Sequence, residues 1–253
     1  MDPAESEVCF CWSKKLHGLH YINFLGDGDS KTFARLKNAD PPVCVDTVMQ
    51  KLECCSHVQK RMGCQLTNKV TEQKGKNFVH KGKTTKEIHG KGGLTKKAIL
   101  KIQGHFGAAI RNNSGNLTQT KQDIWAMWHH CCRHHQHCGN WCLSKSGKGD
   151  PNQNSLPDYL CEAIKPVFVT LTHDGLLQKC LHGGTQNTNE SFHKVIWQRC
   201  PKTVFVSRKQ LCIAVADATI VFSDWECGCF GVLGKLGMVL GKWTRQCFQC
   251  GQN

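Results

Sequence analysis

The amino-acid sequence predicts a mostly helical fold with few strands, and three observations support this. Apolar residues recur at helical spacing in several segments, as Ile99, Ile102 and Phe106 do on one predicted face. Short strand-like runs are few, and residues 20–25 form the clearest one. The chain has 253 residues, of which 40% are apolar, so it can build a sizeable core, and this composition argues against wholesale disorder.

The first elements follow from helix stop signals and turn residues. Residues 5–16 are expected to form a helix because Gly18 lies just past their end. The strand-like run 20–25 leads into a glycine-rich turn, after which Ser30 can cap a short helix over residues 31–37.

Later elements are mainly helices separated by loops. Residues 43–52 show no clear period, and the Gly/Asn/Ser/Pro-rich stretch 144–157 is typical of a loop or linker. No fixed-period internal repeat is present. Further helices are expected at residues 57–66, 94–110, 117–128, 158–178, 189–197 and 211–222.

The positive charge of the chain is concentrated in one block. The formal net charge is +14, and residues 60–101 contain 12 Lys/Arg against 2 acidic residues. Five glycines interrupt this block, so we expect a helix end, a solvated loop and a new helix from about residue 94. A loop kept soluble by its lysines and an arm that neutralises DNA phosphates both fit this composition. The few interleaved aromatic residues favour duplex over single-stranded DNA. The candidate DNA-binding residues are Lys74, Lys76, Lys81, Lys83, Lys86, Lys91, Lys96 and Lys97.

Composition also narrows the class of protein. Residues 1–7 lack the apolar stretch of a secretory signal, and no run approaches the roughly 20 apolar residues of a membrane span. Eighteen cysteines in a long chain without such a signal favour reduced thiols and metal ligation over a disulfide scaffold. We therefore expect a soluble, intracellular, basic protein.

Two acidic positions are candidates for chemistry. Asp27 and Asp29 directly follow the strand-like run, and carboxylates at a strand end are well placed to bind Mg²⁺. A Gly-Asp-Gly-Asp sequence is also a common turn composition. Glu190 lies in the first turn of a predicted helix, where the helix dipole alone favours a carboxylate.

Cysteine and histidine cluster in the middle of the chain. Residues 129–142 have a density of Cys and His that packing rarely demands, which indicates a zinc site or a redox-sensitive surface loop that binds metal adventitiously. The candidate ligands are His130, His137, Cys138 and Cys142, with the choice among neighbouring His and Cys left open. Two shorter pairs, Cys54-x-x-His57 and Cys247-x-x-Cys250, are each half of a four-ligand site, and the first also fits a helix start with a buried Cys.

Four segments together resemble a known family. Residues 21–33 (YINFLGDGDSKTF), 51–63 (KLECCSHVQKRMG), 107–112 (GAAIRN) and 182–205 (HGGTQNTNESFHKVIWQRCPKTVF) are similar to the Mutator-like transposase domain of animal repeat elements. The resemblance runs through most of residues 17–240. It implies an RNase H-like core of the DDE transposase superfamily, whose three carboxylates hold two Mg²⁺ or Mn²⁺ ions for attack on a phosphodiester. The fold class implied is α/β (α+β), a partial RNase H-like core interrupted by a largely helical, basic insertion.

The resemblance assigns roles residue by residue. Asp27 matches the second carboxylate, with Asp29 as the alternative, and Glu190 matches the glutamate of the family's Asn-Glu-Ser stretch. Cys54 and His57 match a Cys-x-x-His pair that follows the second carboxylate. The Cys/His-rich segment falls where related proteins carry a His…Cys…Trp-Cys segment inside the helical insertion.

One element of the family pattern has no counterpart. The first catalytic Asp lies in the family on a strand upstream of the helix with which this chain opens, and Asp2 follows no apolar strand. We therefore expect either an N-terminally truncated copy that does not cleave DNA, because two carboxylates position two ions poorly, or an incomplete gene model. The expected domains are residues 1–59 (partial core), 60–157 (insertion), 158–240 (C-terminal part of the core) and 241–253 (tail).

The function expected is that of a transposase-derived DNA-binding protein. Its partners would be double-stranded DNA at transposon ends and further copies of the chain as a homo-oligomer, with no membrane, and its location would be the nucleus. Expected cofactors are Mg²⁺ or Mn²⁺ at an intact carboxylate site and structural Zn²⁺ at the Cys/His segment. The alternative is a zinc-stabilised nucleic-acid-binding module without nuclease ancestry in its site.

Overall fold

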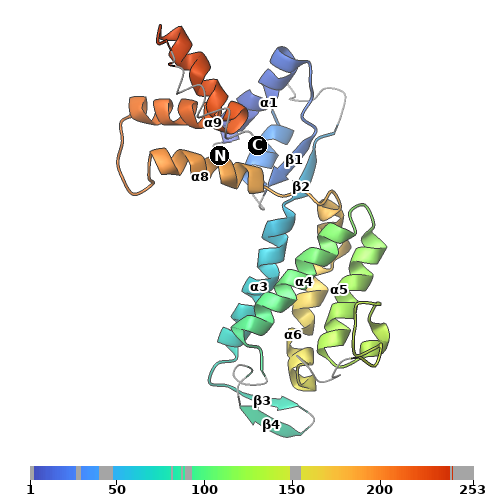
Figure 1. Cartoon of the computed structure of the whole chain (residues 1–253). Coiled ribbons are helices and arrows are strands. Elements are labelled where there is room, and N and C mark those ends of the chain that lie inside the picture. Colours follow the sequence, from blue (N-terminus) through green and yellow to red (C-terminus); the bar gives the residue numbers. More distant parts are fainter. Residues whose placement is uncertain are drawn as a thin grey trace. The chain divides into compact units, whose positions relative to one another are not determined.

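Helices dominate the structure, as the periodicity predicts (Figure 1). The computed structural model describes residues 3–26, 30–39, 48–80, 82–86, 88, 93–148, 155–239 and 241. The chain divides into two units, residues 1–185 and 186–253, which are described separately. Among the described residues, no helix has both the length and the apolar composition needed to cross a bilayer.

Within its described residues, the first unit contains the helices α1 and α2 beside a small sheet, a bundle formed mainly by α3, α4, α5 and α6, and a β-hairpin. Its elements in chain order are α1 (Pro3–His17), β1 (Asn23–Gly26), α2 (Ser30–Lys37), β2 (Gln50–Glu53), α3 (Cys55–Glu72), β3 (Asn77–His80), β4 (Lys83–Lys86), α4 (Lys96–Asn112), α5 (Leu117–Cys131), η1 (His135–His137), α6 (Asp158–Leu171), α7 (Asp174–Leu177) and η2 (Gln178–Cys180).

The small sheet consists of β1 and β2, which pair in parallel from Asn23 with Gln50 to Gly26 with Glu53. The strand β2 lies in a stretch whose period was unclear, because a polar four-residue strand leaves no alternation to detect. The ring of Phe24 on β1 lies 6.1 Å from that of Phe33 on α2. The described residues hold two parallel strands here, so the RNase H-like core stays a prediction.

The helices α3 and α4 run antiparallel and pack closely. A Cβ atom added at Gly63 of α3 would lie 1.9 Å from Gln103 Oε1 of α4, and one added at Gly107 would lie 2.1 Å from Gln59 Oε1. Arg111 donates to the same Gln59 oxygen at 2.6 Å. Because early residues of α3 meet late residues of α4, the end of α3 lies beside the start of α4.

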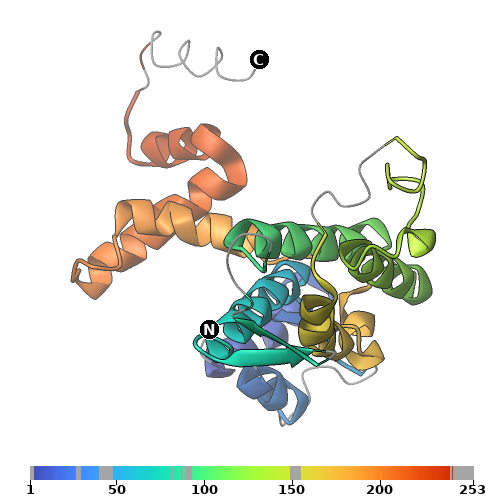
Figure 2. The same ribbon diagram turned by 90° about the horizontal axis from the view of Figure 1, so that it is seen from below.

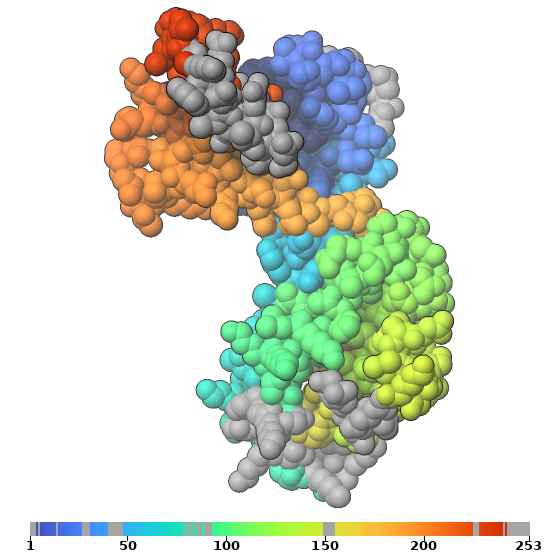
Figure 3. All heavy atoms as spheres, viewed as in Figure 1, coloured from blue at the N-terminus to red at the C-terminus, as the bar shows by residue number. Residues whose placement is uncertain are grey.

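One hydrophobic core joins these helices with α5 and α6. Phe106 of α4 and Phe168 of α6 are fully buried, and Trp125 and Trp128 of α5 pack beside each other with ring centroids 5.7 Å apart. Figure 3, which is viewed as Figure 1 is, shows α4 and α5 side by side at the molecular surface. The face of α4 that the sequence predicts to be apolar is the face buried here, since Ile99, Ile102 and Phe106 are all in the core.

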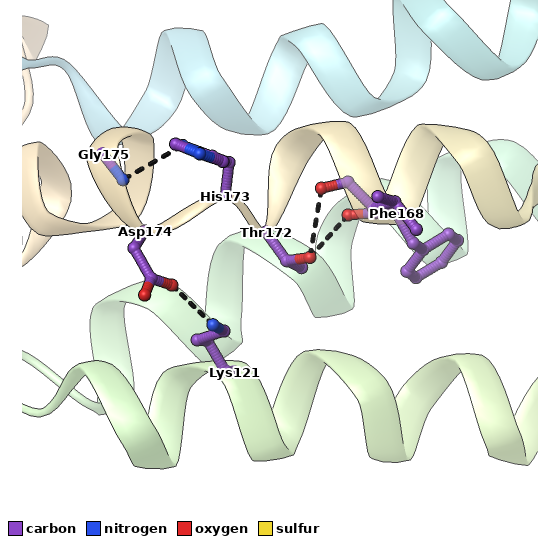
Figure 4. Close-up of polar contacts among 7 residues, drawn as sticks. Lys121, Phe168, Thr172, His173, Asp174 and Gly175 are labelled. Atoms are coloured by element: carbon purple, nitrogen blue, oxygen red, sulfur yellow. Dashed lines mark hydrogen bonds and ion pairs between the residues drawn. The ribbon is translucent and has the colours of Figure 1, made fainter.

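The helix predicted over residues 158–178 ends earlier, at Leu171. Figure 4 shows the reason: the Thr172 hydroxyl donates to the Phe168 carbonyl at 2.8 Å, and His173 Nδ1 accepts from the Gly175 N–H at 3.2 Å. His173 therefore caps a new helix, α7, whose Asp174 forms an ion pair with Lys121 of α5 at 2.5 Å. A cap residue that competes for backbone groups ends the first helix and begins the second.

Within the basic block, β3 and β4 form an antiparallel hairpin where the sequence predicts part of a solvated loop. β3 and β4 pair from Asn77 with Lys86 to His80 with Lys83, across a two-residue connection that ends in Gly82. Lys and Gly are poor strand formers, so composition favoured a loop; the pairing is a finding of the structure. The helix α4 then begins after Thr95, whose side chain accepts from the Ala98 N–H.

The second unit is a pair of packed helices, α8 (Asn187–Arg199) and α9 (Arg208–Lys235). Ser207 and Gln210 form a reciprocal capping box at the start of α9. The rings of Phe192 and Phe222 lie 5.3 Å apart, and Arg199 forms an ion pair with Asp217 between the helices.

Candidate functional site

The Cys/His-rich segment begins where α5 reverses direction. The N–H of His134 donates to the His129 carbonyl and that of Arg133 donates to the His130 carbonyl, which together make a Schellman motif. Arg133 adopts the left-handed conformation with φ of 66°, a position that glycine usually occupies. The reversal turns the chain back, so η1 lies beside the last turn of α5.

Four side chains converge at this reversal: His130 from α5, His135 from η1, and the buried thiols of Cys138 and Cys142. His130 Nδ1 lies 3.5 Å from the Sγ atoms of both Cys138 and Cys142. His135 Nδ1 also lies 3.5 Å from Cys142 Sγ. All four ligand atoms lie within 4.8 Å of one another.

These distances match a tetrahedral zinc site. Zn–S bonds of about 2.3 Å and Zn–N bonds of about 2.0 Å at a tetrahedral angle put sulfur and nitrogen about 3.5 Å apart. A single thiol–imidazole hydrogen bond accounts for one such distance, whereas here one nitrogen approaches two sulfurs and one sulfur approaches two nitrogens. The His₂Cys₂ cluster (His130, His135, Cys138 and Cys142) can therefore hold zinc.

The electrostatics of the cluster also suit a divalent cation. Burial, followed by the nearby His135, lowers the pKa of His130, which favours the neutral imidazole that binds metals. Burial, together with the neighbouring Cys142, raises the pKa of Cys138 to about 12 in the metal-free chain. A zinc ion supplies the positive charge that stabilises the thiolate, so zinc binding and loss of the thiol proton are coupled.

Surrounding groups hold the cluster in place. Lys145 Nζ donates to the Cys138 carbonyl at 2.7 Å, and the Trp141 ring lies 5.1 Å from the His130 ring. Cys132, at the end of α5, forms a disulfide with Cys161 of α6, which departs from the expectation of reduced thiols. The base of the cluster is thus attached to the helical core.

The structure brings three of the four candidate ligands together and places the fourth, His137, outside the cluster. His137 is exposed and its ring lies against His129, with centroids 4.1 Å apart. His135 occupies the fourth position instead. The Arg133 reversal decides which of these two histidines points inward, and a left-handed arginine carries no sequence signal that could have revealed it.

The predicted carboxylates are not brought together within the described residues. Asp27 and Asp29 lie outside them, although the strand that precedes Asp27 is present and paired. Glu190 is exposed in the first turn of α8, in the second unit. The assignments of Asp27, Asp29 and Glu190 therefore stay predictions, as does the Mg²⁺ or Mn²⁺ that they would hold. Cys247 and Cys250 also lie outside the described residues.

The carboxyl end of the sheet is nevertheless well fixed. His182 Nδ1 accepts from the Gly184 N–H at 2.8 Å, so Nε2 carries the proton and donates to the Glu53 carbonyl at 3.1 Å. The carboxylate of Glu53 is buried and bonded to Arg61 Nη2 at 2.7 Å. Residues 182–184, from one of the segments that carry the resemblance, therefore lie against the end of β2.

Cys54 and His57 flank the start of α3 beside this edge. Cys54 is fully buried and stands at the N-cap position, and His57 is half-buried in the first turn. Among the described residues, they are not part of a cluster of three or more candidate metal ligands. A zinc role for this pair stays a prediction.

Comparison with known protein families identifies the family to which this chain belongs. The family model described as Mutator-like transposase matches residues 1–142, more than half of the chain. The chain belongs to the Mutator-like transposase family. The match extends from α1 to Cys142, so it includes the sheet, the basic hairpin and all four members of the His₂Cys₂ cluster. Comparisons with curated proteins and with solved structures return no match.

In the sequence, the candidate DNA-binding lysines of this transposase-family chain fall between the end of α3 and the first turn of α4. Lys74 and Lys76 are exposed after the end of α3, and Lys96 and Lys97 are exposed in the first turn of α4. Lys83 and Lys86 belong to β4. Lys81 and Lys91 lie outside the described residues.

Proposed function

We propose that this Mutator-like transposase-family chain is a nuclear protein that binds double-stranded DNA at transposon ends through the basic end of its α3–α4 helix pair. The observation that carries the proposal is the antiparallel packing of these helices. It brings exposed lysines that are 20 or more residues apart in the sequence, Lys74 and Lys76 on one side and Lys96 and Lys97 on the other, to the same end of the bundle.

The lysine charges and the dipole of α4 at this end of the bundle both favour binding of DNA phosphates. Lysine clusters neutralise backbone phosphates and release condensed counterions. The N-terminus of the 17-residue helix α4 adds the positive end of its dipole at the same place. Glu72 is the described acidic residue nearest in the sequence to Lys74. Because Glu72 is already paired with Lys69 at 2.9 Å, it does not fully offset the charge of the other lysines.

The zinc site supports this function indirectly. It fixes the end of α5, which packs on α4 within the same core. In this proposal zinc is structural, because two thiolates and two imidazoles complete a closed tetrahedral set and leave no position for a substrate. The alternative function, a zinc-stabilised nucleic-acid-binding module, also includes a structural zinc ion. This proposal keeps that zinc ion and assigns it to a transposase-family protein.

DNA binding is expected to fall steeply with salt. If Z lysines contact phosphates, the slope of log affinity against log salt is about −0.9Z, and removing two contacts should make it shallower by about 2. The double variant Lys74→Gln/Lys76→Gln is therefore expected to weaken duplex binding and flatten the slope, measured by fluorescence anisotropy at several salt concentrations.

The matched control is Lys209→Gln/Lys235→Gln, which removes the same charge from exposed positions of α9. It is expected to keep the slope of the unmodified chain. A flat salt dependence, or equal losses in both double variants, would contradict the proposal.

We propose that this chain does not cleave DNA strands. The sequence matches Asp27 and Glu190 to two of the three carboxylates that the family uses, and in-line chemistry with two ions needs the full set. We expect no Mg²⁺- or Mn²⁺-dependent cleavage of terminal-repeat DNA, measured on end-labelled duplex. Robust cleavage that disappears in Glu190→Gln would overturn this part while leaving DNA binding intact.

A further inference from the structure

The connection between α3 and α4 contains a narrow, two-stranded ribbon. Within the described residues, β3 and β4 pair only with each other, so the ribbon is not part of a larger sheet. Its turn ends in Gly82 with φ of 75°, a conformation that glycine adopts without strain. Figures 1 and 2 show the ribbon at the end of the bundle that lies away from β1 and β2.

Both ends of the ribbon are attached to the helical core. On one side, the N–H of Gln73 donates to the Lys69 carbonyl as α3 ends. On the other side, Ile88 and Leu94 are both 1% exposed, and the Leu94 N–H donates to the Ile88 carbonyl at 2.8 Å. A ribbon held at both ends loses less freedom on binding than an open loop would.

The chemistry of the ribbon indicates an anionic partner. Residues 74–86 contain five lysines and no acidic residue. On the ribbon itself, the cross-strand pair of Val79 and Thr84 is exposed, with Val79 at 66%. The ribbon thus presents an exposed Val–Thr pair within a stretch of sequence that is rich in lysine and free of acidic residues.

We propose that the β3–β4 ribbon enters the major groove of duplex DNA; this rests on the proposed DNA-binding function. The major groove, about 12 Å wide, admits a two-stranded ribbon and presents a distinct pattern for each base pair, whereas the minor groove is about 6 Å wide and presents a degenerate pattern. The exposed Lys74 and Lys76 beside the ribbon then contact phosphates on the groove walls, and the Val79–Thr84 pair faces the base edges. Valine and threonine methyl groups suit the thymine methyl, which is exposed in this groove.

The test combines a groove footprint with a matched pair of variants of the full chain on random-sequence duplex DNA. Dimethyl sulfate methylates guanine N7 in the major groove and adenine N3 in the minor groove, so one reagent reports on both. We expect the unmodified chain to protect guanine N7 and to leave adenine N3 reactive. Val79→Glu/Thr84→Glu should weaken duplex binding roughly tenfold or more and remove the N7 protection, because it puts negative charge in the groove.

The control is Val169→Glu/Thr170→Glu on α6, which makes the same change of residues and charge at two exposed positions. It should bind and protect as the unmodified chain does. Far-ultraviolet circular dichroism checks that both variants stay folded. If the chain binds DNA with the expected salt dependence but protects adenine N3, or if both variants bind equally, the ribbon proposal fails and the proposed function stands. If the unmodified chain does not bind duplex DNA, both fail.

Discussion

Replacing His135 with Asn is expected to abolish stoichiometric zinc binding, whereas replacing His137 with Asn is expected to leave it unchanged. His135 Nδ1 lies 3.5 Å from Cys142 Sγ inside the His₂Cys₂ cluster, whereas His137 stacks on His129 outside it. Loss of a direct ligand should weaken zinc binding by about 100-fold or more, since even outer partners contribute 10- to 100-fold. The measurement is zinc content per chain after dialysis against a weak chelator.

Two further variants complete this experiment. Cys142→Ser removes a ligand that is 2% exposed and should behave as His135→Asn does. Cys64→Ser removes an exposed thiol of α3 and should retain zinc. Zinc retained in His135→Asn and lost in His137→Asn would restore the ligand set that the sequence predicted.

Phe106→Ala is expected to lower the free energy of unfolding by about 3–5 kcal/mol. Phe106 is 0% exposed at the centre of the core that joins α3, α4, α5 and α6, so its removal loses apolar burial and leaves a cavity. Urea unfolding followed by tryptophan fluorescence measures the change, because Trp125 and Trp128 belong to the same core.

Leu100 on the same helix offers the control. It is 56% exposed, so Leu100→Ala should change the free energy of unfolding by no more than about 0.5 kcal/mol. Equal effects of the two substitutions would mean that α4 does not bury the face described here.

The helices were predictable because their signals are local. Gly18 beyond α1 and the apolar face of α4 marked elements that the structure confirms. The two sheets were harder to predict, since β2 is a polar strand of four residues, and β3 (NFVH) and β4 (KTTK) are four-residue strands within a lysine- and glycine-rich stretch. Their pairing depends on where α3 and α4 place the chain, which no local pattern records.

The candidate metal site was predictable in composition and not in detail. The density of Cys and His in residues 129–142 identified the segment, and three of the candidate ligands, His130, Cys138 and Cys142, lie together in the cluster. The fourth depends on the left-handed conformation of Arg133, which is a property of the folded turn. The disulfide between Cys132 and Cys161 depends in the same way on the packing of α5 against α6.

The antiparallel packing of α3 and α4 has a consequence for how such a protein can diverge. Because the two helix ends lie side by side, the connection between them can gain or lose residues without moving either helix. Gly63 and Gly107 have less freedom, since an added methyl group would meet the amide end of the facing glutamine, which would have to move. Natural variants should therefore tolerate changes of length and charge between residues 73 and 95 more readily than changes at the α3–α4 contact. The surface that we propose for DNA binding can thus vary without altering the helical core that supports it.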